Sequence, residues 1–553
     1  MMVQTFSLSK PLIGVVMIGV FVALGTVLAL SFSGPMKVAF AFGGLVLLVP
    51  ALVVRDPTAY GLFLLVFSIP MDVHTHTTTW LADPQVLLDQ YGFPASGTSS
   101  VAIYLTDVVL VAMLLPWLAQ LCRRQRTLYF PKIGYIFLLY LAWALIVSLL
   151  EAKSLYLSIF EWIREILYFI FFLYIVNNVV TRVQFRAVVL ALFVGLVIES
   201  GAVITFFNLG IGTEFNFFND LLYGGTSRVE TTQLTVAESG EGKHIARSAG
   251  TFTHPSQAAY YFEFILPIVL GFLVAARRAW NQILFGTVFG IGCVALVLTF
   301  SRSGILGFLV INAVFFSVAR WSRLISRQMF TCCAFVAAIS AALSTPLLIN
   351  YLETRPEAGS FRWTLIMPSV DAFAERPISG AGLNNSSAVT EGSRSIVVTS
   401  TGHSEYRMSV VHNHYLIVLV EVGIVGFLLF FAFFWQTIVT AFRHMRAAGT
   451  ESKLLLVGIV SALGGIAIHN FGDPFGGHPA RAMLWLYAGL VFAICRRVPA
   501  EPALPMVANK WLGDRPLIAG RGSSPRPSTI SALGAPVNNI GARRQSRRQK
   551  KIQ

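Results

Sequence analysis

The sequence predicts an all-α polytopic membrane protein. Of its 553 residues, 55% are hydrophobic and only 12% are charged, and the mean hydropathy is +0.70. Such a chain is too apolar to fold as soluble domains. Its apolar runs have about the 20 residues that a helix needs to cross the hydrocarbon core, and none alternates as barrel strands do. We therefore expect an α-helical bundle with about 12–14 transmembrane helices.

The candidate passes follow one another along most of the chain. The first run, Pro11–Leu30, lacks an arginine-rich start and is followed at once by another membrane-length run. We therefore interpret it as a retained helix rather than a signal peptide. The third run is the shortest. The fourteen candidates are 11–31, 37–54, 58–70, 102–121, 133–150, 157–179, 184–207, 257–276, 282–299, 303–319, 329–349, 413–436, 453–470 and 480–495.

Alternate connections between these passes are basic, which orients the bundle. Lysine-rich and arginine-rich connections face the cytoplasm, so both termini are expected there. The connections at 71–101, 208–256, 350–412 and 471–479 then face outward. The predicted organisation is transmembrane helices over 1–349 with periplasmic loops at 71–101 and 208–256, a large periplasmic loop at 350–412 between the eleventh and twelfth passes, C-terminal helices over 413–495, and a disordered basic cytoplasmic tail at 496–553.

Composition also excludes several classes of partner. The net charge of +15 comes from helix ends and from the tail, a distribution that suits a membrane surface rather than nucleic acid. The cysteines lie in apolar runs or at basic helix ends, so we expect neither a disulfide framework nor a zinc site, and no metal ligand set. These cysteines are Cys122, Cys293, Cys332, Cys333 and Cys495.

Ionisable residues inside the predicted helices are concentrated in their outer halves or near the midplane. Charges in a membrane are costly and usually line a cavity or pair, so the pattern indicates a polar cavity open to the outside. Glu161, Arg164 and Glu165 are three and four residues apart on one helix face, so pairing within the helix is an equal alternative. The full set is Asp107, Glu161, Arg164, Glu199, Glu263 and Glu421.

Arginines gather on the predicted outer side. They are either solvated loop charges or a site for a phosphate-bearing ligand, whose geometry matches the guanidinium fork. Arg302 lies in the hairpin Thr299–Gly304, which has almost no loop and would hold it at the membrane surface. A snorkelling arginine is the alternative. The outer arginines are Arg228, Arg247, Arg302, Arg355, Arg362, Arg376, Arg394 and Arg407.

A histidine pair stands at the predicted outer start of a helix, in His412-Asn413-His414. An unperturbed histidine pKa near 6.5 suits proton exchange with water and substrate, although a polar cap at the interface would look the same. Glu421 follows His414 by two turns on the same helix face, about 10 Å away and too far for a hydrogen bond. We expect Glu421 to cap a buried network.

The order of these motifs resembles the bacterial O-antigen ligase and polymerase family, the WaaL and Wzy-type enzymes. The resemblance covers roughly 245–430. Its pieces are Arg247-Ser-Ala-Gly-Thr-Phe-Thr-His-Pro, Ser301-Arg-Ser-Gly, Arg362-Trp363, Pro377-x-x-Gly-x-Gly-x-Asn384, His412-Asn-x-Tyr-Leu and Glu421-x-Gly.

The resemblance implies a GT-C-like glycosyltransferase of the bacterial inner membrane, without metal, cofactor or nucleotide sugar. Its donor would be an undecaprenyl-diphosphate-linked oligosaccharide, and its acceptor a hydroxyl of a glycan or a lipid core at the periplasmic face. The product would be O-antigen, capsule or exopolysaccharide. By position, His412 would be the catalytic base or the residue that orients the acceptor. Arg302 would hold the diphosphate, with Arg247 and Arg362 as weaker candidates for the same contact. Arg164, Glu161, His414 and Glu421 are supporting candidates.

Other functions stay open at this point. Length alone slightly favours a polymerase over a ligase, and a chain-length regulator is a possible partner. A flippase of lipid-linked glycan would use the same arginines, but it predicts polar groups through both membrane halves and tolerance of His412→Ala. A non-catalytic assembly subunit would tolerate substitution of both His412 and Arg302.

Overall fold

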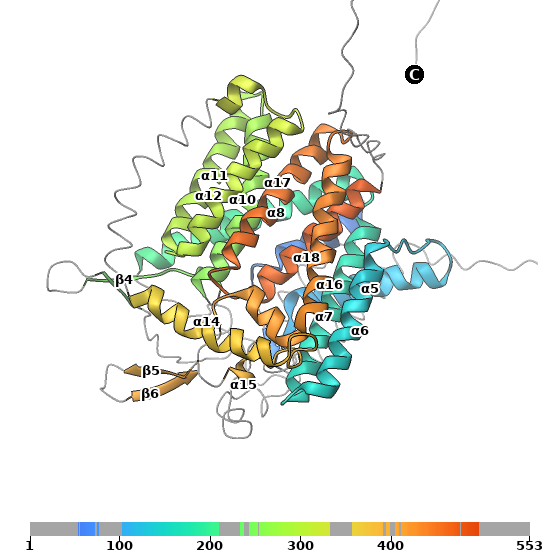
Figure 1. Ribbon diagram of the computed structural model, residues 1–553. Helices are drawn as coiled ribbons and strands as arrows, with labels where there is room; N and C mark the ends of the chain where they lie inside the picture. The colour runs from blue at the N-terminus through green and yellow to red at the C-terminus, as the bar shows by residue number, and fades with distance from the viewer. Residues whose placement is uncertain are drawn as a thin grey trace, which may run out of the picture. The chain divides into compact units, whose positions relative to one another are not determined.

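The computed structural model is mainly α-helical (Figure 1), and the part of the chain that it describes also contains three two-stranded sheets. It describes residues 54, 56–71, 74–76, 102–209, 233–236, 243–252, 254–331, 357–390, 394–398, 404–408, 411–475 and 477–496. The helices are α3 (Pro57–Phe67), α5 (Leu105–Cys122), α6 (Ile133–Glu151), α7 (Leu155–Asn178), α8 (Arg182–Asn208), α10 (Pro255–Ala275), α11 (Ala279–Leu298), α12 (Arg302–Trp321), α14 (Glu357–Glu375), α15 (Ser386–Val389), α16 (His414–Met445), α17 (Thr450–His469) and α18 (His478–Cys495). The antiparallel sheets pair β1 (His74–His76) with β2 (Ala102–Tyr104), β3 (Gln233–Val236) with β4 (Lys243–Ala246), and β5 (Arg394–Val398) with β6 (Ser404–Met408).

Nine helices in the described part of the chain are long and apolar enough to cross a membrane. The all-α polytopic class is therefore confirmed. Helix α7 has 24 residues, which is also a spanning length, but it carries three buried charged side chains. Helix α3 has 11 residues and covers only about 16 Å, so the third predicted pass is too short to cross alone. The candidates 11–31 and 37–54, nearly all of 329–349, and the C-terminal tail lie outside the described residues.

Two sets of neighbouring helices build the core. Helices α10, α11, α12 and α17 pack side by side, and α6, α7, α16 and α18 form the other set (Figure 1). In the second set the ring of Trp485 lies 4.5 Å from that of Phe137 and 5.0 Å from that of Phe433. In the first set, a Cβ added to Gly465 would lie 2.6 Å from the carbonyl oxygen of Gly307, so α12 and α17 meet backbone to backbone. Such small-residue contacts are typical of membrane helices.

Helix α16 is broken at Gly423, whose φ of 64° and ψ of −174° leave the helical region. The predicted motif Pro377–Asn384 fills the break. Ala381 N–H donates to the carbonyl of Val420, Gly382 N–H to that of Glu421, and Ile424 N–H to that of Pro377, at 2.8–2.9 Å. The motif thus supplies the hydrogen bonds that the interrupted helix lacks, which a membrane interior requires.

Steric constraints explain why this motif contains glycines. Gly380 and Gly382 both have positive φ, and a Cβ on Gly380 would lie 2.6 Å from backbone atoms of Glu421 and Gly423. Farther along, Asn385 Oδ1 accepts from Ser154 N–H at 2.8 Å and its Nδ2 donates to Ser158 Oγ at 2.8 Å. The segment is therefore attached to α7 as well as to α16, and the predicted large loop is structured where it is described.

The two ends of the bundle differ in chemistry. Helices α10, α12, α16 and α18 run parallel to one another, so their C-terminal ends lie at the same side, together with the start of α17. That side carries Arg277, Arg278, Arg320, Arg323, Arg443, Arg446, Lys453 and Arg496. The opposite side, called here the site end, holds the N-termini of α10, α12, α16 and α18 and the C-terminus of α17.

Candidate functional site

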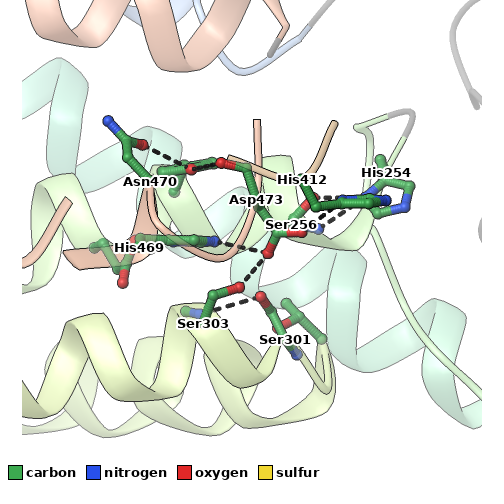
Figure 2. Close-up of polar contacts among 12 residues, drawn as sticks. His254, Ser256, Ser301, Ser303, His412, His469, Asn470 and Asp473 are labelled. Carbon is green, nitrogen blue, oxygen red and sulfur yellow. Dashed lines mark hydrogen bonds and ion pairs between the residues drawn. The ribbon is translucent and has the colours of Figure 1, made fainter. Parts of the chain in front are cut away.

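Asp473 stands at the centre of the site end, in the connection between α17 and α18. Its Oδ1 lies 3.4 Å from His412 Nδ1. Its Oδ2 lies 3.3 Å from His469 Nε2 and accepts a hydrogen bond from Ser303 Oγ (Figure 2). Three segments far apart in the sequence therefore converge on one carboxylate.

Local structure places each of these side chains. Ser303 is in the first turn of α12, whose N-cap Ser301 accepts from Gly304 N–H at 3.2 Å. His412 stands just before α16, which is capped by Asn413 through the N–H of Leu416. The N–H of His414 donates to the carbonyl of Asn470 at 2.9 Å and so joins the start of α16 to the end of α17.

His469 continues the site inward. Its Nδ1 lies 2.6 Å from Glu263 Oε2, and both side chains are fully buried. The Tyr260 ring stacks on the imidazole, with centroids 3.7 Å apart and planes 12° apart. Tyr260 also donates its hydroxyl hydrogen to Asn470 Oδ1 at 2.8 Å. Helix α10 thus holds His469 on one ring face and at one nitrogen.

Electrostatics keep Asp473 ionised. Its burial alone would raise the pKa of the carboxyl, but the close contact with His412 and the hydrogen bonds from His469 and Ser303 outweigh burial and hold the pKa well below its usual range. His412 is the more accessible partner, with 35% of its side chain exposed. A buried carboxylate next to a reachable imidazole is the arrangement that orients a general base.

His254 forms a neutral neighbour of this pair (Figure 2). Its Nδ1 accepts the N–H of Ser256 at 3.2 Å, which caps α10 and requires an unprotonated nitrogen. Partial desolvation and the positive charge of Arg247 lower the pKa of His254, against the opposing effect of Asp473. His254 therefore adds no charge of its own at neutral pH.

The predicted arginines have different positions. Arg247 is half-buried, and its Nε donates to the carbonyl of Thr299 at 3.1 Å, at the hairpin between α11 and α12. Its charge acts on His254, so it lies beside the site. Arg302 is the first residue of α12, directly before Ser303, and is half-buried. Arg362 lies in α14, and its side chain is outside the described residues.

The supporting candidates Glu161 and Arg164 belong to a second buried network. Arg164 pairs with Asp107 on α5, at 2.7 Å. Glu161 pairs with Arg481 on α18, and Glu165 lies 3.7 Å from the same guanidinium. Pairing within α7 was one of two alternatives for these charges, and the structure provides them with partners on two other helices.

His414 and Glu421 contact residues other than Asp473. His414 is buried against Phe475, with ring centroids 5.6 Å apart, and the ring of Phe475 lies 5.2 Å from that of Tyr260. Glu421 Oε1 accepts from Ser386 Oγ at 3.0 Å, so it does join a buried network. Of the sequence candidates, His412, Arg302 and Arg247 lie at the site end beside Asp473.

Residue-level prediction missed Asp473, His469, Ser303 and Arg481. His469 and Asp473 are four residues apart at the end of an apolar run, a pair of titratable groups on one face that the sequence displays. Ser303 lies inside the Ser-Arg-Ser-Gly motif, but the sequence predicted a role only for the arginine of that motif. Arg481 is a charge in the first turn of a pass, a position that usually has a function or a buried partner.

The fold and site define a polytopic membrane protein with a histidine–aspartate pair where helix ends meet. Residues 285–431 match a family model described as O-Antigen ligase. This match supports the resemblance carried by the motifs and indicates a function of the O-antigen ligase or polymerase type in surface polysaccharide synthesis. The match includes Arg302, Ser303 and His412, whereas Asp473 and His469 lie beyond it. No curated protein matches the chain.

Proposed function

We propose that this protein is an inner-membrane glycosyltransferase that moves a glycan from undecaprenyl diphosphate to an acceptor hydroxyl at the periplasmic face. The observation that carries the proposal is the contact between His412 and buried Asp473, 3.4 Å apart, at the helix end that begins with Arg302 and Ser303. A reachable imidazole paired with an ionised carboxylate lies there beside cationic groups. Such a transfer requires a base to deprotonate the acceptor and cationic groups to bind the diphosphate.

In this mechanism His412 removes the proton of the attacking hydroxyl. The acceptor oxygen bonds to the anomeric carbon of the donor, and the bond from that carbon to the diphosphate oxygen breaks. Asp473 holds the imidazole by Nδ1, so that Nε2 is the nitrogen free to act, and it stabilises the imidazolium that forms. A single displacement of this kind inverts the configuration at the anomeric carbon.

The leaving diphosphate takes the electron pair of the broken bond, so the site must neutralise it. Arg302 and Arg247 are the assigned cations, since a guanidinium matches phosphate geometry. The N-terminus of α12 adds partial positive charge at the same place. Preorganised cations of this kind lower the barrier by stabilising charge as it develops. The chemistry is the same for polymerisation and ligation, which differ in the acceptor.

The distribution of buried charge supports an enzyme over a flippase. Among the described residues, the buried aspartate, glutamate, arginine and histidine side chains lie within about 15 Å of the helix ends at the site end, by helix rise. A path for a lipid-linked anion would need polar groups through both halves. These side chains are Glu161, Arg164, Glu165, Glu199, Glu263, His414, Glu421, His469, Asp473 and His478.

A reconstitution tests the proposal. Purified protein in liposomes receives a polyprenyl-diphosphate-linked oligosaccharide, with a second lipid-linked glycan or a lipid-core acceptor. We expect release of polyprenyl diphosphate and a longer or transferred glycan from wild type, and a loss of at least about 100-fold in His412→Ala. His444→Ala is the matched control, because His444 lies on the same helix at the opposite side of the bundle. If the donor instead stays intact and moves to the other leaflet, the protein is a flippase and the proposal is wrong.

A further inference from the structure

The site has a second layer beneath Asp473 that the transfer chemistry does not use. His469 lies between two carboxylates, with Nε2 3.3 Å from Asp473 Oδ2 and Nδ1 2.6 Å from Glu263 Oε2. Glu263 and His469 are both 0% exposed, so water does not compete for these contacts. The chain Glu263–His469–Asp473–His412 therefore runs without interruption from the bundle interior to the accessible base.

The two contacts decide the charge of His469. A carboxylate only accepts hydrogen bonds, so each ring nitrogen facing one must carry a proton. An imidazole with both nitrogens protonated is a cation, and the 2.6 Å contact has the short length of a charge-assisted hydrogen bond. The stacked Tyr260 ring covers one face of that cation, an arrangement that stabilises it further.

The surrounding helices hold Glu263 in place. A Cβ added to Gly307 would lie 2.1 Å from Glu263 Oε1 and 3.1 Å from the carbonyl of Gly465, so α12 leaves room for this carboxylate only because residue 307 is glycine. The remaining oxygen, Oε1, is buried and has no hydrogen-bond partner among the described residues. Burying a carboxylate with an unpaired oxygen costs free energy, so such a group usually has a functional role.

We propose that Glu263 and His469 are positioning residues for the transfer: Glu263 keeps His469 as a buried imidazolium, and this cation fixes Asp473 and sets how readily His412 takes up a proton. The inference rests on the proposed function for its effect on the reaction. The protonation of His469 itself does not depend on that function.

The sign of the effect follows from the charges that face the chain. His469 faces Glu263 and Tyr260 from α10, and Asp473 from the adjacent connection. Asp473 also faces Ser303 from α12 and His412, with His254 and Arg247 close by. In Glu263→Gln, His469 loses the partner that requires its second proton and becomes neutral. The negative charge of Asp473 is then no longer offset, so His412 binds a proton more readily.

Nitrogen-15 NMR of histidine-labelled protein in lipid tests the cation directly. The chain has 10 histidines, and at about pH 8.5 an ordinary histidine is neutral. We expect one histidine with both ring nitrogens protonated at this pH, whose signal disappears in His469→Gln and changes to a neutral ring in Glu263→Gln. If all histidines of the wild type are neutral, the proposal is overturned, whatever the catalytic activity.

The pH profile of kcat/KM tests the consequence. In Glu263→Gln we expect the acid limb to move to higher pH by on the order of one unit, because the limb reports the protonation of the essential base. Glu199→Gln is the matched control, since Glu199 is a buried carboxylate on α8 that accepts hydrogen bonds from Thr251. A purely packing role for Glu263 would lower activity or stability and leave the limb in place, and that result would also overturn the proposal.

Discussion

At the scale of single residues, substitution of Asp473 tests the proposed pairing of Asp473 with His412. Asp473→Asn keeps the shape of the side chain and removes the charge that orients and stabilises a protonated His412. We expect kcat to fall by about 10²–10⁴-fold while donor binding changes little, since the arginines remain. Reconstituted kinetics measure this, with Asp371→Asn on α14 as an exposed control. Wild-type turnover in Asp473→Asn would remove Asp473 from the mechanism.

The same aspartate fixes a pH dependence of stability. Its folded pKa is held below the unfolded value, so the carboxylate contributes stability that is complete above the unfolded pKa, near 3.9, and is lost as pH falls through the folded pKa. At neutral pH Asp473 is therefore ionised in the folded protein. An acid limb of activity between about pH 5 and 7 then belongs to a histidine rather than to Asp473.

At the scale of elements, we expect the break in α16 to matter for the site, because it sets the direction of the first turns of the helix, which follow His412. Gly423→Ala places a Cβ 2.0 Å from the carbonyl oxygen of Ile378, at a φ that side chains avoid. We expect a loss of roughly 2–4 kcal/mol in stability, seen as a lower unfolding temperature in detergent.

Gly290→Ala on α11 is the matched control for this change. A Cβ there meets nothing within 4 Å, and alanine is the better helix former, so stability should stay the same or rise slightly. Equal unfolding temperatures for the two variants would show that the Pro377–Asn384 segment does not depend on the break.

Prediction from sequence succeeded for helices and for motifs, and failed for tertiary partners. Apolar length identifies a spanning helix locally, and the order of motifs singled out Arg302 and His412, which lie near Asp473 in the structure. The partner of His412, Asp473, lies 61 residues later and becomes a neighbour only when α17 packs against α10 and α12. Likewise Glu161 and Glu165 share a face with Arg164, yet burial brings Arg481 from another helix, and a tertiary contact outweighs a weak intrahelical pair.

The sequence did not predict the break in α16, for a related reason. A glycine inside an apolar run is tolerated in membrane helices, so Gly423 by itself does not predict an interruption. The signal was the combination with Pro377-x-x-Gly-x-Gly-x-Asn384, whose glycines need close approach to another backbone. Which backbone they approach is decided by the packing of α6, α7 and α16, and residue patterns alone do not contain it.

At the scale of the whole molecule, the opposite chemistry of the two bundle ends predicts sidedness. Arginines at the end away from the site should face the cytoplasm, so we expect Asp473 and His412 at the periplasmic surface, as the proposed transfer requires. In a cysteine-free background, Glu375→Cys on exposed α14 and Arg327→Cys beyond α12 report the two sides. An impermeant thiol reagent should label position 375 in cells with a permeabilised outer membrane, and position 327 only in inverted vesicles. Labelling of position 327 from the cell exterior would put the site on the cytoplasmic side and exclude the proposed donor geometry.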